Sequence, residues 1–135
     1  MEERIKVLAV YRLEKAQKNL EIADRMVSDR YYNYAINRAY YAVFDGMRAV
    51  NCLEGFDSSK HSGVLAHFTQ FHVKTGDFDA DTSVIIKKAS YLREKSDYED
   101  FFEAEEDDAR EVVKEARIFV RRVKQYLDKM IPGGK

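Results

Sequence analysis

Residues that interrupt helices are almost absent from this chain of 135 residues. Its only proline, Pro132, lies close to the C-terminus, and it contains only six glycines. Because proline and glycine disfavour helix interiors, by about 3 and about 1 kcal/mol relative to alanine, their scarcity favours long helices. No segment of useful length shows the period-two alternation of a half-buried strand. We therefore predict an all-α, up-and-down bundle of four to five helices in a single domain, residues 1–135, with 131–135 as a flexible tail.

Apolar residues recur at spacings of three and four along most of the chain, which locates the helices. The pattern predicts helices over residues 2–27, 30–53, 60–74, 81–96 and from 105 to just before Pro132. Arg12 falls inside the apolar stripe of the first helix. A chain of this length buries roughly two thirds of its unfolded surface, which is enough for a core without disulfides or metal.

Composition and charge exclude several classes of protein. The formal net charge of −1 argues against a strongly basic protein that coats DNA. No apolar run approaches the roughly 20 residues of a membrane-spanning helix, so we expect no membrane association and a cytoplasmic location. Cys52 is the only cysteine, which excludes an intramolecular disulfide and predicts a buried thiol.

The predicted second helix, residues 30–53, has three distinct faces. One face carries large apolar residues and would pack in the core: Ile36, Tyr40, Val43, Met47 and Val50. A second face carries small residues that let another helix approach closely: Ala35, Ala39, Ala42, Gly46 and Ala49. The third face carries polar and aromatic residues: Tyr34, Arg38, Tyr41, Asp45 and Arg48. Such a helix is expected at the centre of a bundle, with the third face accessible.

Two charged residues on the third face suggest how the chain associates. Arg38 and Asp45 are seven residues apart, hence about 10 Å along the helix axis, too far for a direct pair within one helix. Across a two-fold axis, Arg38 of one chain could meet Asp45 of its partner. This arrangement predicts a homodimer through the second helix, and the alternative is an ordinary solvated surface.

Three segments of the chain resemble the HEPN superfamily of small helical-bundle proteins. They are YNYAINRAYYAVFDGMRAV, SSKHSGVLAHF and YLREKSDYEDF, in the order in which the family has them. The resemblance extends over nearly the whole chain. It implies a HEPN-like bundle that is the RNA-targeting member of a toxin–antitoxin pair, with a minimal nucleotidyltransferase as the antitoxin partner.

Active HEPN proteins resemble metal-independent ribonucleases whose signature is a polar residue, an arginine and, after four to six residues, a histidine. Asn37 and Arg38 match the first part, whereas Asp45 stands where the histidine is expected. The resemblance thus implies Arg38 and Asp45 as catalytic positions, supported by Asn37. Aspartate, with an ordinary pKa near 4, is a poorer base and acid than histidine at neutral pH. Burial would raise this pKa, but we expect the neighbouring arginine to lower it again. We therefore predict weak or absent RNA cleavage.

Several side chains are candidates for binding RNA or a nucleotide. The resemblance and the third face together indicate Arg38, Tyr41, Arg48 and His61 as binding residues, since cations and aromatic rings recognise phosphates and bases. For His61 the alternative is a structural role in helix capping and packing. The alternative for the whole protein is a non-catalytic nucleotide-binding or protein-interaction module.

No metal site or cofactor is predicted. On the predicted helix 60–74, His61 and His72 share a face but lie about 16 Å apart, and His67 points elsewhere. The chain has no Glu-x-x-His pair of the kind found in di-iron bundles. Arg93, Asp97 and Tyr98, in the third family-like segment, are expected to form a structural polar network.

Overall fold

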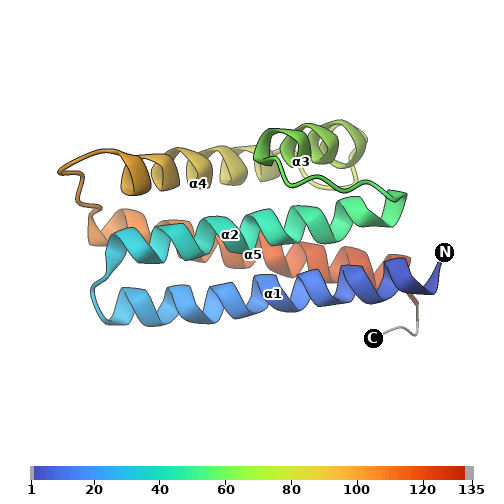
Figure 1. Cartoon of the computed structure of the whole chain (residues 1–135), viewed down its shortest axis with the longest axis horizontal. Helices are drawn as coiled ribbons and strands as arrows, with labels where there is room; N and C mark the ends of the chain where they lie inside the picture. The colour runs from blue at the N-terminus through green and yellow to red at the C-terminus, as the bar shows by residue number, and fades with distance from the viewer. Residues whose placement is uncertain (1, 133–135) are drawn as a thin grey trace.

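The computed structural model describes residues 2–132, and all regular secondary structure in this range is helical. The α-helices are α1 (Glu3–Ser28), α2 (Tyr32–Asn51), α3 (His61–Phe68), α4 (Asp81–Tyr98) and α5 (Glu106–Met130). A short 3-10 turn, η1 (Cys52–Glu54), follows α2, and a π-helical turn, η2 (Thr69–Val73), follows α3. The long helices run in alternating directions, and α3 with α4 forms the third leg of the bundle (Figure 1). The prediction of an all-α, up-and-down bundle is confirmed.

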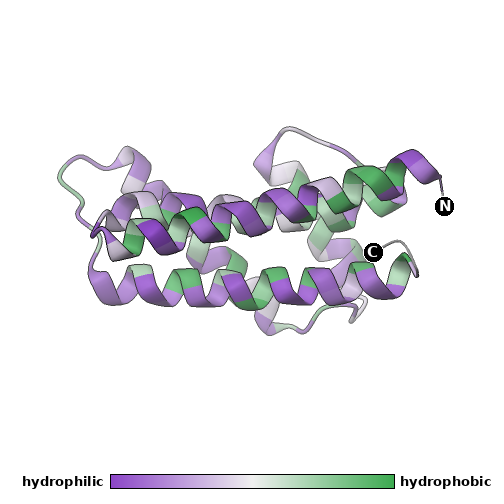
Figure 2. Cartoon of the chain, turned by 90° about the horizontal axis from the view of Figure 1, so that it is seen from below, coloured by the Kyte–Doolittle hydropathy of each residue, from purple (hydrophilic) through white to green (hydrophobic). Residues whose placement is uncertain are grey.

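Helix α2 lies at the centre of the bundle, between α1 on one side and α3 with α4 on the other (Figure 1). It also packs against α5, which lies behind it in this view. All ten residues predicted for its large apolar face and its small-residue face are buried. The polar and apolar residues that alternate along α1 and α5 in Figure 2 are typical of helices that expose one side and bury the other.

Gly46 permits the close approach of α2 and α5. A Cβ atom at this position would lie 2.9 Å from Cε2 of Phe119 and 3.3 Å from Cγ2 of Val123. Phe119 is fully buried, so its ring has little freedom to move away. The small-residue face predicted from sequence therefore has the packing role expected of it.

The π-helical turn changes the orientation of the histidines in the third leg of the bundle. The N–H of Lys74 donates to the carbonyl of Thr69 at 2.9 Å, a bond that spans five residues instead of four. As a result, His67 and His72 lie on the same side, and the rings approach to 6.3 Å between centroids. The prediction that His67 points away from the other histidines is wrong with respect to His72, because it assumed a regular α-helix.

Cys52 is buried, as predicted. Ile131 is also buried against the core, while residues 133–135 of the predicted tail lie outside the described range. In the described part of the chain, no helix combines the length and the apolar character that crossing a membrane requires.

Candidate nucleic-acid interface

Hydrogen bonds to two side-chain amides hold the guanidinium group of Arg38, in the second turn of α2. Its Nε and Nη2 atoms donate to Asn37 Oδ1 at 3.0 and 2.8 Å, and Nη1 donates to Asn19 Oδ1 on α1 at 3.1 Å. Both acceptors are neutral, and within residues 2–132 Arg38 forms no ion pair with a carboxylate. The guanidinium is thus held in place while its positive charge stays available to an external anion.

Asn37 connects Arg38 to α4. Its Nδ2 group donates to the two carboxylate oxygens of Asp97 at 3.3 and 3.0 Å. Asp97 lies 3.7 Å from the guanidinium of Arg93, whose Nη1 atom is 3.5 Å from the Tyr98 hydroxyl. The polar network predicted for Arg93, Asp97 and Tyr98 is therefore confirmed. It orients the Asn37 amide so that the amide oxygen faces Arg38.

Asp45 points towards α1 and is not part of an accessible polar face. The residue is only 6% exposed, and its Oδ2 atom accepts a hydrogen bond from Asn19 Nδ2 at 2.9 Å. Burial raises the pKa of the Asp45 carboxyl above its ordinary value, although Lys15 and the Asn19 hydrogen bond partly counter this effect. The expectation that a neighbouring arginine would keep this pKa low is wrong, because the loss of solvation outweighs the effect of the surrounding cations.

Asn19 links the two charged residues of α2 within one chain. Its amide oxygen accepts from Arg38 and its amide nitrogen donates to Asp45. Sequence reasoning missed this residue, although a signal was present: Asn19 follows Ala16 by three positions in the apolar stripe of α1. A polar side chain in such a stripe requires a hydrogen-bonding partner inside the fold.

His61, the first residue of α3, contacts α2 through a hydrogen bond and an aromatic cluster. Its Nδ1 atom lies 2.8 Å from the Tyr40 hydroxyl, and its ring centroid is 4.3 Å from that of Phe44. Burial lowers the pKa of the imidazole, and the charge of Arg93 lowers it further, so His61 is neutral at neutral pH. If the Tyr40 hydroxyl donates to Nδ1, the ring proton is carried by Nε2. His61 thus packs against α2, which is the alternative given for it from sequence, and its Nε2–H group remains available to a ligand.

Tyr41 brings Arg38 and His61 into one site. The Arg38 guanidinium lies 5.2 Å from the Tyr41 ring centroid, and the His61 ring is edge-on to the same ring at 5.8 Å. Both contacts are within the range of cation–π and aromatic interactions. Asn37, Arg38, Tyr41 and His61 therefore form a single half-buried surface, which we call the Arg38 surface.

Arg48 lies in a different cluster, although it was predicted as a binding residue with the others. Its Nη2 atom is 2.8 Å from Asp57 Oδ1, and Arg12 Nη2 lies 3.1 Å from the same oxygen. The hydrogen bonds from Arg48 and Arg12 lower the pKa of Asp57. Two arginines thus share one carboxylate, so Arg48, unlike Arg38, is already paired with a negative charge.

The HEPN domain family matches residues 9–126 of the chain. The chain belongs to the HEPN family. The resemblance noted from sequence is therefore confirmed, and the match includes every residue of the Arg38 surface.

Curated relatives match most of this HEPN protein. "Putative toxin MJ0142" of Methanocaldococcus jannaschii is 31% identical over 115 residues, which cover 85% of this chain and 78% of the relative. "Putative toxin MJ0605" of the same organism is 33% identical over 119 residues, 88% of each chain. A "UPF0332 protein" of Thermotoga maritima is 29% identical over 128 residues, 95% of this chain and 96% of the relative. Two of these three relatives are thus named as putative toxins, and each of the three is matched over more than three quarters of its own length.

Proposed function

We propose that this HEPN protein is the RNA-targeting toxin of a toxin–antitoxin pair and that its Arg38 surface contacts the RNA backbone. One observation carries the proposal: neutral amides, and not carboxylates, hold the Arg38 guanidinium in place. An arginine paired with a carboxylate would have to break that pair to bind a phosphate, whereas Arg38 does not. The names of two relatives support the assignment to the toxin class.

The neighbours of Arg38 add contacts that suit single-stranded RNA. The half-buried Tyr41 ring provides a face on which an unstacked base can lie. The neutral His61 imidazole can donate a hydrogen bond from Nε2 to a phosphate oxygen or a 2′-hydroxyl. Arg48 is expected to contribute less, because Asp57 already pairs with it.

Cleavage by this surface is expected to be weak or absent. A general base must lie within hydrogen-bond reach of the 2′-hydroxyl that it deprotonates. Asp45 is buried and already accepts a hydrogen bond from Asn19, so it is poorly placed for this role in spite of its raised pKa. We propose instead that Asp45 is a positioning residue, which orients Asn19 and through it Arg38.

Two protein partners complete the proposal. The first is a second copy of the chain, bound through α2, because the Arg38 surface and the exposed Tyr34 lie on the same side of this helix. The second is a minimal nucleotidyltransferase-type antitoxin, as the family resemblance implies.

Fluorescence anisotropy with a short labelled single-stranded RNA tests the binding role. Arg38→Ala is expected to weaken binding at least tenfold and to reduce the slope of log affinity against log salt by roughly 0.7, the contribution of one phosphate contact. Arg121→Ala, which removes an exposed cation on α5, provides a matched control with little expected effect. Equal affinities of wild type and Arg38→Ala, with both proteins folded by circular dichroism, would remove Arg38 from the interface.

A cleavage assay with the same RNA separates a weakened ribonuclease from a binding module. Asp45→His restores the histidine of the family pattern, but position 45 is buried against α1, so we expect no more cleavage than in wild type. A gain in cleavage that Arg38→Ala abolishes would instead show that a side chain at position 45 reaches the RNA. Strong wild-type cleavage that is lost in Asp45→Asn would contradict the positioning role and make the aspartate itself catalytic. Absence of both RNA binding and cleavage would favour the alternative of a nucleotide-binding or protein-interaction module.

A further inference from the structure

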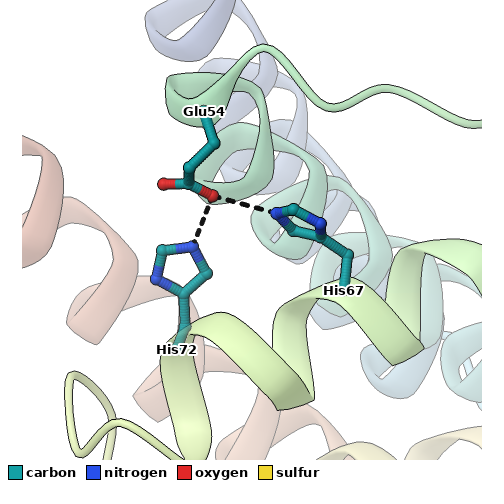
Figure 3. Close-up of side chains that lie close together, drawn as sticks. All are labelled: Glu54, His67 and His72. Carbon is teal, nitrogen blue, oxygen red and sulfur yellow. Dashed lines mark hydrogen bonds and ion pairs between the residues drawn. The ribbon is translucent and has the colours of Figure 1, made fainter.

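We infer that Glu54, His67 and His72 form a binding site for a divalent metal ion of the zinc type, separate from the Arg38 surface. Glu54 Oε1 lies 3.0 Å from His67 Nε2 and 2.8 Å from His72 Nε2, and the three ligand atoms all lie within 4.8 Å of one another. Figure 3 shows the two imidazole rings turned towards the same carboxylate oxygen. Three different segments, η1, α3 and η2, thus bring their donors to one point.

Two local backbone features produce this convergence. Glu54 ends the 3-10 turn η1, and Gly55 follows it in the left-handed conformation, with φ of 78°. The backbone therefore turns away from the cluster directly after Glu54, whose side chain points into it. The π-helical turn η2 places His72 on the same side as His67, although the two residues are five positions apart. A regular α-helix would rotate His72 away by more than a third of a turn.

Surrounding side chains hold both imidazoles in the orientation that metal binding requires. The Nδ1 atom of His72 lies 3.1 Å from Asp77 Oδ2, which leaves Nε2 as the metal-facing atom. Such a carboxylate–histidine contact is the usual outer support of a metal-bound histidine. The Tyr126 hydroxyl donates to the same Asp77 oxygen at 3.3 Å. The His67 ring stacks on Phe56 with centroids 4.1 Å apart.

The donor set fits a tetrahedral ion with one open position. Two imidazole nitrogens and one carboxylate oxygen are ligands that Zn²⁺ accepts, with bonds of about 2.0–2.2 Å and neighbouring ligands about 3.3 Å apart. The contacts of Glu54 therefore need to lengthen by a few tenths of an ångström, which its half-exposed side chain permits. The two imidazole nitrogens, which lie within 4.8 Å of each other, need to approach to about the same spacing. The side chain of His72 is only 2% exposed and that of His67 only 11%, so both nitrogens are largely shielded from water.

The position of the cluster suggests a structural role for the ion. Glu54 lies sixteen residues beyond Arg38, about 24 Å along the direction of α2. A metal ion here would clamp the η1 turn to the third leg of the bundle far from Arg38, although His61 of the Arg38 surface begins the same helix that carries His67. The metal-free alternative is an ion-pair network in which protons on the imidazoles replace the metal.

Isothermal titration of untagged, chelator-treated protein with Zn²⁺ tests the inference, with Co²⁺ absorption as a report on tetrahedral coordination. We expect one ion per chain, a higher unfolding temperature with metal, and at least a tenfold loss of affinity in both Glu54→Gln and His67→Gln. Asp77→Asn is expected to weaken binding about 10–100-fold without removing a ligand. These variants avoid substitution of His72, whose ring is part of the buried core.

His61→Gln is the matched control, because it removes a histidine outside the cluster and should leave zinc affinity unchanged. Absence of one-to-one zinc binding by the wild type, or equal affinity in wild type, Glu54→Gln and His67→Gln, would overturn the metal site in favour of the ion-pair network. The RNA-binding assay with Arg38→Ala does not depend on this result, so either proposal can fail alone.

Discussion

The amide nitrogen of Asn19 donates a hydrogen bond to Asp45 Oδ2 across 2.9 Å and so joins the middle of α1 to the middle of α2. The oxygen of the same amide accepts from Arg38. One neutral side chain therefore fixes both a buried carboxylate and a guanidinium that remains available for binding. Asn19 thus connects the buried Asp45 to the accessible Arg38.

Replacement of Asp45 by asparagine should change how stability depends on pH. The pKa of Asp45 is raised in the folded protein. The contribution of Asp45 to the free energy of unfolding is therefore fully present below the ordinary pKa of aspartate and is lost as the pH rises through the raised value. Asp45→Asn retains an acceptor for Asn19 and has no such ionisation. We expect the variant to gain stability relative to wild type as the pH rises above about 4. Urea denaturation at several pH values measures this, and a difference that does not vary with pH would contradict the prediction.

Loss of the Asn19 amide, the donor in the hydrogen bond to Asp45, should destabilise the fold. Asn19→Ala leaves Asp45 without its hydrogen-bond donor, and we expect a loss of about 1–3 kcal/mol in the free energy of unfolding. Lys18→Ala, at the exposed neighbouring position, is the control and should change stability by no more than about 0.5 kcal/mol. Similar effects of the two substitutions would show that the Asn19 contact has little energetic weight.

The imidazole of His61 should titrate below the ordinary histidine pKa of 6.5, because burial and the charge of Arg93 both disfavour its protonated form. A titration followed by NMR measures the midpoint directly. Arg93→Gln removes one of the two causes and should move the midpoint upwards, whereas burial should keep it below 6.5. A wild-type midpoint above 6.5 would contradict the neutral imidazole on which the proposed phosphate contact depends.

The exposed aromatic residues at the start of α2 should mediate self-association. Tyr34 is 66% exposed and lies edge-on to the exposed Tyr31. Sedimentation at micromolar concentration should show a dimer for the wild type and a monomer for Tyr34→Glu, which places a charge in the proposed interface. Tyr11→Glu, at an exposed position on α1, is the control and should remain dimeric. A monomeric wild type would end the proposal of a dimer through α2.

Enlargement of Gly46 should destabilise the contact between α2 and α5. The new methyl group of Gly46→Ala would lie 2.9 Å from the buried Phe119 ring, and overpacking of a core typically costs about 1–3 kcal/mol. The higher helix propensity of alanine offsets about 1 kcal/mol of this loss. We expect a net loss of roughly 1 kcal/mol in urea denaturation. A net gain would show that Phe119 moves aside without strain.

The sequence was sufficient to predict the helices, because helix periodicity and breaker residues act locally. The two buried faces of α2 follow directly from this periodicity, as Ile36 and Gly46 illustrate. The sequence could not predict which residues of the polar third face would be buried by a neighbouring helix. Asp45 and Arg38 share that face and both bond to Asn19 on another helix, yet only Asp45 is buried.

The histidines show a second limit of prediction from sequence. Whether His67 and His72 share a face depends on the hydrogen-bond pattern of the backbone between them. The apolar periodicity of the sequence does not reveal that pattern, because π-helical turns are rare and occur mostly as single turns within α-helices. The partnership with Glu54 depends further on η1, which comes from outside that helix.

The π-helical turn has the length of an α-helical turn that has received one additional residue. If Gln70 were deleted, His67 and the following histidine would be four positions apart, a spacing at which side chains in a regular α-helix are neighbours. An insertion of this kind thus preserves the spatial relation of two side chains while it erases their familiar spacing in the sequence. Two HEPN proteins that differ by one residue in this segment could therefore carry the same histidine pair under patterns that a comparison of spacings would treat as unrelated.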